Sequence, residues 1–167
     1  MTRLFFVLAC AAALLASGCS KQPKEVPEVA KKEAAALVSE AQFAMSIREY
    51  SRAEELIQRA LKLHDDMPEY WVSLGMALRK QENKDGARKA YQKALGLHED
   101  RYEADKRPEE LAQQAFVLAL LGKTDEALKL LEKSVKEHPD SAELKKQAGP
   151  RGFPRTFQTA EFKALAL

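Results

Sequence analysis

The distribution of apolar residues along the chain predicts a series of α-helices. From about residue 33 onward, apolar residues recur three and four positions apart, which places them on one face of a helix. Prolines, glycines and short polar stretches interrupt this pattern, and Pro68 and Pro108 suit a first helical turn, where the missing N–H is not needed. We predict helices at 29–46, 51–64, 68–81, 84–98, 108–121, 124–137, 141–148 and 157–166. The expected fold class is therefore all-α.

Small residues reveal an internal repeat. Ala53 and Ala60 recur with the same spacing as Ala87 and Ala94. A third unit continues the pattern after a longer shift, to Ala127, so we place a charged insertion near 102–107. Helical hairpins with a period of about 34 residues form solenoids, which usually bind other proteins. The repeats are expected at 34–67, 68–101 and 108–141, in a domain of 33–148 that ends with a partial fourth helix at 142–148.

The second unit carries the most complete motif. Residues with little bulk let two helices approach closely, and large residues fill the space beside them; these packing positions are Trp71, Leu74, Gly75, Ala87, Tyr91 and Ala94. The motif resembles the tetratricopeptide repeat (TPR) family. In the outer units Leu37 and Leu111 stand in place of the tryptophan, and Glu40 and Gln114 in place of the leucine before the small residue. The resemblance implies a short α-solenoid of three helical hairpins with C-terminal capping helices.

The same resemblance implies a concave groove lined by the first helix of each repeat. The groove positions would be Val38, Gln42 and Met45, then Val72, Met76, Arg79 and Lys80, then Ala112, Phe116, Ala119 and Leu120. Such a groove is apolar with a basic edge, which suits an extended or helical peptide of some acidic character. Methionine side chains adapt to varied partners. Alternatively, Phe116 and Leu120 pack beneath the chain's own C-terminal segment.

The C-terminal segment, 149–167, is expected to form a turn and a capping helix. Glycines and prolines at 149–155 predict the turn, and Thr156 is suited to cap the helix that follows. The helix would expose Phe157, Phe162, Leu165 and Leu167 if it had no partner. It therefore either closes the last repeat, which solenoid ends require, or mediates association with another chain. We favour closure.

The first residues of the chain indicate export. Arg3 precedes an unbroken apolar run, Leu4–Ala16, which has the length of a signal-peptide core and is too short to span a bilayer. The following Gly18-Cys19 resembles a bacterial lipobox, in which a peptidase cuts before a cysteine that becomes lipid-modified. We expect a signal peptide at 1–18 and lipid attachment at Cys19. An ordinary secretory signal with an incidental cysteine is the alternative, and Ala16 stands where lipoboxes more often have leucine.

Residues 19–32 are predicted to be a flexible tether. The segment is polar and holds Pro23 and Pro27. Ten residues in polyproline geometry reach about 30 Å, enough to hold the repeats clear of a lipid surface. Because Ser20 and not aspartate follows Cys19, resemblance to Gram-negative lipoproteins favours anchoring to the outer membrane on its periplasmic side.

Charge and reactive residues narrow the classes of function. The chain has 27 basic and 25 acidic residues, without the basic excess of a nucleic-acid-binding protein. Its three histidines, His64, His98 and His138, fall at equivalent places near the ends of second helices, too far apart to share one metal. Cys10 leaves with the signal peptide, so no internal disulfide is expected. No nucleophile motif or phosphate loop is present. We expect no metal, cofactor or enzymatic activity.

The sequence thus predicts a membrane-anchored TPR scaffold on the periplasmic side of the bacterial envelope. Its partner would be a protein or peptide, and its task would be to assist assembly of an envelope, pilus or secretion complex. Two alternatives stay open. The chain is a structural, self-associating subunit of an envelope complex, or it is an accessory to an envelope enzyme with a glycan-binding groove.

Overall fold

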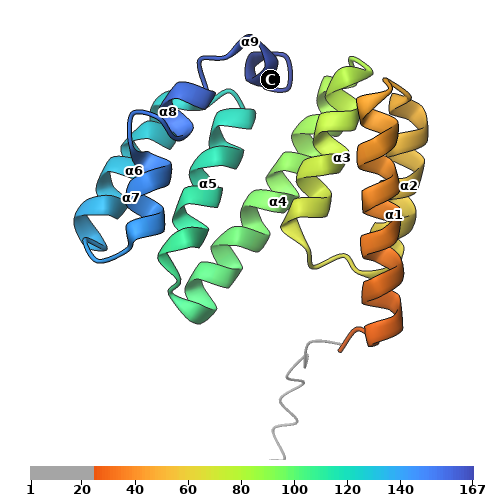
Figure 1. Ribbon diagram of the computed structural model, residues 1–167, viewed down its shortest axis with the longest axis horizontal. Coiled ribbons are helices and arrows are strands. Elements are labelled where there is room, and N and C mark those ends of the chain that lie inside the picture. The colour runs from red at the N-terminus through yellow and green to blue at the C-terminus, as the bar shows by residue number, and fades with distance from the viewer. Residues whose placement is uncertain (1–24) are drawn as a thin grey trace, which may run out of the picture.

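The computed structural model describes residues 25–167. The predicted signal peptide, Cys19 and the first part of the predicted tether, up to residue 24, lie outside this range. The described part is helical without strands, and Figure 1 shows its hairpins arrayed side by side. The helices are α1 (Glu28–Ser46), α2 (Tyr50–Leu63), α3 (Pro68–Lys80), α4 (Lys84–Asp105), α5 (Pro108–Leu120), α6 (Thr124–Glu137), α7 (Ala142–Ala148), α8 (Phe153–Thr156) and α9 (Ala160–Lys163). None of them is long and apolar enough to cross a membrane. The predicted all-α solenoid is confirmed.

Three helical hairpins, α1–α2, α3–α4 and α5–α6, build the solenoid, and packing of α2 on α3 and of α4 on α5 joins each hairpin to the next. Small residues occupy the places where helices meet: Ala53, Ala60, Ala87 and Ala94 have no exposed surface. Gly75 lies directly against the ring of Tyr91, with no room for a side chain. Close packing of this kind depends on small residues because protein interiors are filled nearly to crystal density.

The turn inside each hairpin has the same structure in all three repeats. Arg48, Glu82 and Gly122 adopt positive φ angles of 65°, 64° and 80°. The N–H of the following residue bonds back to a carbonyl in the last turn of the first helix, each time at 2.9 Å. These bonds satisfy carbonyls that the helix end leaves without a partner. The spacing between the three turns is the same as the spacing between the small residues that define the sequence repeat.

Most helix ends agree with the predicted ones to within one residue, but the end of α4 does not. This helix continues from the predicted end at residue 98 to Asp105, through most of the expected insertion, and stops at Lys106 with a φ of 52°. The residues after His98 contain no glycine or proline until Pro108, so nothing in them interrupts a helix. The insertion therefore lengthens the second hairpin.

The start of α1 corrects the predicted tether. The helix begins at Glu28, inside the segment predicted as a tether at 19–32. Pro27 precedes it, and the Glu28 carboxylate lies 3.9 Å from the Lys31 ammonium one turn later. An acidic residue in a first turn interacts favourably with the helix dipole. The two predictions overlapped at 29–32: the helix predicted at 29–46 is correct to within one residue at its start, and residues 28–32 belong to that helix and not to the tether.

The predicted helix at 157–166 does not form as one element. Only the single turn α9 forms within it, and Thr159 rather than Thr156 caps that turn: its hydroxyl accepts a hydrogen bond from the Phe162 N–H at 3.1 Å. The other short turn, α8, lies before residue 157, partly in the segment predicted as a turn at 149–155. Phe157 and Phe162 are almost completely buried. Packing of these two rings against the third repeat decides the conformation of the segment, because helices this short have little stability of their own.

Candidate functional site

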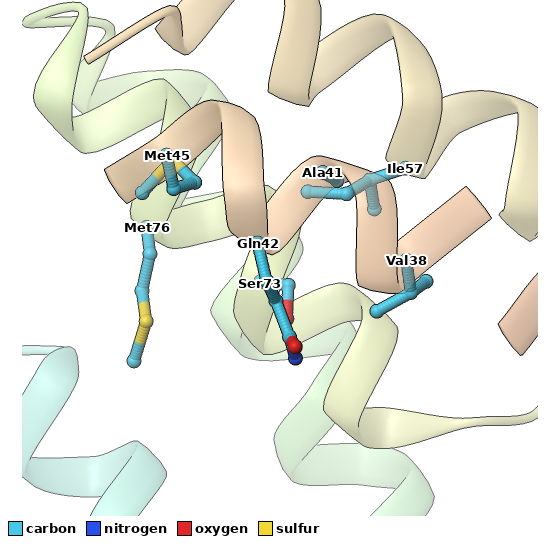
Figure 2. Close-up of a pocket in the computed structure, with 7 residues that line it drawn as sticks. All are labelled: Val38, Ala41, Gln42, Met45, Ile57, Ser73 and Met76. Atoms are coloured by element: carbon cyan, nitrogen blue, oxygen red, sulfur yellow. The ribbon is translucent and has the colours of Figure 1, made fainter. Parts of the chain in front are cut away.

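An open pocket lies between the first two repeats, at the predicted groove. It has a volume of about 210 Å³, and its lining residues are Val38, Ala41, Gln42, Met45, Ile57, Ser73 and Met76. Figure 2 shows residues of α1, α2 and α3 around the same hollow, with Met45 and Met76 on one side and Val38 and Ile57 on the other. The pocket is largely apolar, and Gln42 and Ser73 supply its polar groups. Such a surface can receive an apolar side chain and hydrogen-bond to its backbone.

The remaining predicted groove residues have different surroundings. Val72 and Lys80 are half-buried on α3 and do not line the pocket. Ala112, Ala119 and Leu120 on α5 have no exposed surface. The predicted groove is therefore not one continuous open surface. Its first part, on α1 and α3, is open, and its part on α5 is covered.

An aromatic cluster covers the third repeat. Phe116 of α5 lies with its ring centroid 5.2 Å from that of Phe153, 6.4 Å from Phe157 and 5.5 Å from Phe162. The last of these contacts is edge-to-face, an arrangement that aromatic rings prefer. Phe116 and Leu120 therefore pack beneath the chain's own C-terminal segment, which was the alternative to an open groove.

The final three residues are held through their main chain by three different helices. Tyr91 Oη of α4 donates to the Leu165 carbonyl at 2.9 Å, and Arg79 Nε of α3 donates to the Ala166 carbonyl at 2.7 Å. The Leu167 N–H donates to the carbonyl of Leu120, the last residue of α5, at 2.9 Å. Figure 1 shows α9 and the C-terminus at one end of the gap between α3 and α5. Arg79 is thus engaged inside the molecule and does not form a free basic edge.

Tyr91 is suited to hold a carbonyl group. Its side chain has no exposed surface, and burial raises the pKa of its phenol well above the usual range. The phenol therefore remains protonated and able to donate at any physiological pH. Because the ring lies against Gly75, the direction of its hydroxyl is fixed.

The three histidines make separate local contacts. His98 Nδ1 lies 2.7 Å from Glu110 Oε2, and both side chains are buried between α4 and α5. His64 pairs with Asp66 and His138 contacts the Tyr102 hydroxyl. No group of histidines, cysteines and carboxylates in residues 25–167 has the arrangement of a metal site.

The buried pair of His98 and Glu110 was not predicted from the sequence. It belongs to a small network in which Arg107 also binds Glu110 at 3.0 Å and the Gln114 amide donates to the His98 carbonyl at 3.2 Å. The available signal was the presence of Glu110 and Gln114 on the buried side of an otherwise apolar helix. Because α4 was expected to end at residue 98, His98 was placed near a helix end instead of inside an interface.

Comparison with known families agrees with this architecture. Two models described as tetratricopeptide repeat match the chain, one at residues 38–104 and one at residues 113–141, together more than half of its length. The chain belongs to the TPR family. The first match begins within α1 and covers most of the two hairpins around the open pocket, and the stretch between the matches contains the turn after the extended α4. TPR domains are protein–protein interaction modules and generally non-catalytic. No curated protein shows significant similarity to the chain.

Proposed function

We propose that this TPR protein is a lipid-anchored scaffold of the bacterial envelope that binds a peptide or protein partner in the open pocket between α1 and α3. The observation that carries the proposal is the pocket itself: apolar, open, and lined mainly by the first helices of two repeats. Since Arg79 is occupied by the C-terminal segment, the partner needs an apolar side chain more than it needs acidic groups. Gln42 and Ser73 would bind the main chain of that partner.

The position in the cell is proposed from the sequence. The apolar run before Gly18-Cys19 supports export and lipid modification, and Ser20 supports the outer membrane with the repeats facing the periplasm. In that place the module would assist assembly of an envelope, pilus or secretion complex. A glycan-binding accessory has less support, because the residues lining the pocket include neither aromatic rings nor carboxylates. A self-associating subunit is the other candidate, and light scattering of the purified protein tests it.

Replacement of Cys19 by alanine should move the protein from the membrane to the soluble fraction. Modification of a lipobox cysteine attaches more than one acyl chain, which gives stable anchoring where a single chain is marginal. The measurement is membrane fractionation, together with labelling by a radioactive fatty acid. Cys10→Ala is the matched control and should keep both the label and the membrane location. Unchanged fractionation of the Cys19→Ala variant would show that the cysteine is not the anchor.

Met76→Glu should abolish partner binding at the open pocket and leave the melting temperature nearly unchanged. Met76 is half-buried but lines the open pocket, so a carboxylate there can reach water in the free protein and must lose that water when an apolar group docks. A photo-crosslinking residue in place of Gln42 reports the contact in cells. Its adducts should disappear in the Met76→Glu background.

Leu128→Glu is the control for this measurement, because Leu128 is also a partly exposed apolar residue but belongs to α6 and does not line the pocket. Adducts at residue 42 that persist with Met76→Glu, or that Leu128→Glu removes equally, would contradict a binding site at this pocket.

A further inference from the structure

The surface around Arg79 of α3, Tyr91 of α4 and Leu120 of α5, called here the gap between α3 and α5, has the properties of a second binding site, and in this structure it holds a segment of the chain itself. The segment Phe157–Leu167, called here the tail, has buried Phe157 and Phe162, and Leu165, Ala166 and Leu167 half-buried. Its last three residues form hydrogen bonds with Tyr91, Arg79 and Leu120 through main-chain atoms, and their side chains pack against the hydrophobic core. Main-chain recognition fixes the path of a peptide without selecting its side chains, so the hydrogen-bonding groups of this gap are not specific to the tail.

The receptor side of the gap is formed by residues of the repeats themselves. Tyr91 is held against Gly75 in the core of the second repeat, and Arg79 and Leu120 belong to the last turns of α3 and α5. Without the tail, the Leu120 carbonyl would lose its hydrogen-bond donor, the Leu167 N–H. The Tyr91 hydroxyl would lose the Leu165 carbonyl, its only acceptor among the residues that the structure describes. These groups and the apolar surface beneath the tail would then face water, so a peptide that supplies the same hydrogen bonds and covers the same surface is favoured in its place.

The tail, in contrast, has little regular secondary structure. Its helical part, α9, is a single turn, and the connection from α7 contains Gly149, Pro150 and Gly152. Segments with little internal structure open more readily than the rest of a fold, because their order depends on docking. Because Phe157 and Phe162 belong to the hydrophobic core, a partner that displaces the tail must cover the third repeat with equivalent apolar groups.

We propose that the gap between α3 and α5 is a second peptide-binding site, and that a partner carrying a phenylalanine followed by small and aliphatic residues displaces the tail from it. The aromatic ring of that partner would replace Phe162 against Phe116, 5.5 Å between centroids, and its main chain would take the bonds to Tyr91, Arg79 and Leu120. This site is distinct from the open pocket between α1 and α3, which the tail leaves free.

The test uses a fluorescent synthetic peptide with the sequence of residues 157–167, added to the full-length chain in mild detergent. The resident tail should exclude the peptide from the wild type. Phe162→Ser weakens the docking of the resident tail but leaves Phe116, Tyr91 and Arg79 intact, and this variant should bind the peptide at least tenfold more tightly than the wild type. Leu165→Asp, at a half-buried position, gives the same test with less risk to the fold. Circular dichroism establishes that each variant is folded.

Two further variants locate the bound peptide. Tyr91→Phe, combined with Phe162→Ser, removes the hydroxyl and should weaken binding several-fold, about the effect of one buried hydrogen bond. Met45→Glu in the same background alters only the open pocket and should leave peptide binding unchanged. The proposal is overturned if folded Phe162→Ser and Leu165→Asp bind no more tightly than the wild type. It is also overturned if Met45→Glu, and not Tyr91→Phe, removes binding, since the peptide would then occupy the open pocket.

Discussion

Gly75→Leu will destabilise the second repeat severely, and even Gly75→Ala will lower stability, although alanine is the better helix former. A Cβ atom at this position would lie 2.5 Å from Cδ1 of Tyr91 and nearer still to Cε1. Tyr91 cannot move aside easily, because its side chain is fully buried and its hydroxyl is bonded to the Leu165 carbonyl. Overpacking of a core costs about 1–3 kcal/mol, which exceeds the gain of about 1 kcal/mol from replacing glycine in a helix.

Thermal unfolding measures this effect. We expect Gly75→Ala to lower the melting temperature by a few degrees and Gly75→Leu by roughly 5–10 °C, since 1 kcal/mol corresponds to about 2–4 °C in a domain of this size. Ala87→Leu should behave like Gly75→Leu, because Ala87 also has no exposed surface.

Gly96→Ala is the matched control. Gly96 also lies inside a helix, but a Cβ there would meet nothing within 4 Å. This substitution should raise stability by about 0.5–1 kcal/mol, because glycine loses more backbone entropy on folding than alanine. If Gly75→Ala stabilises the protein as Gly96→Ala does, the close packing of α3 against α4 is wrong.

Most of the fold could be predicted from the repeat period. Residues one period apart occupy equivalent places in three dimensions, which is why the turns at Arg48, Glu82 and Gly122 have the same structure. The same reasoning failed for α4. The period placed its end at residue 98, but helix formation in 99–105 depends on the local residues, and these continue the helix.

The C-terminal segment was harder to predict because it has no counterpart in the other repeats. Its apolar residues were recognised, but local pattern favoured a single helix at 157–166. Contacts far away in sequence, between Phe116 and the rings of Phe157 and Phe162, decide its conformation instead. The sequence therefore left two alternatives for the part of the groove on α5, which could be open or covered by the C-terminal segment. The pocket residues on α1 and α3, in contrast, could be predicted from helix periodicity and the TPR resemblance.

His98→Leu should produce a large loss of stability that a second substitution restores. The Glu110 carboxylate is buried, and its partners are His98 at 2.7 Å and Arg107 at 3.0 Å. Without the imidazole, the carboxylate keeps only the contact with Arg107, whose side chain is mostly solvent-exposed. Breaking a buried pair by removing one partner costs about 3–5 kcal/mol, and we expect the lower end of this range because Arg107 remains.

The double variant His98→Leu/Glu110→Leu should regain most of the lost stability, because replacing both members of a buried pair by apolar residues is often close to neutral. Urea unfolding of the two single variants and the double variant forms a complete cycle. The exposed pair of Lys106 and Glu103, at 2.6 Å, provides the comparison, and Lys106→Ala should cost less than about 1 kcal/mol. Additive losses in the cycle would mean that His98 and Glu110 do not interact. A strongly negative coupling energy would instead show that His98 and Glu110 stabilise the interface between α4 and α5, which joins the third repeat, with the tail packed on it, to the second.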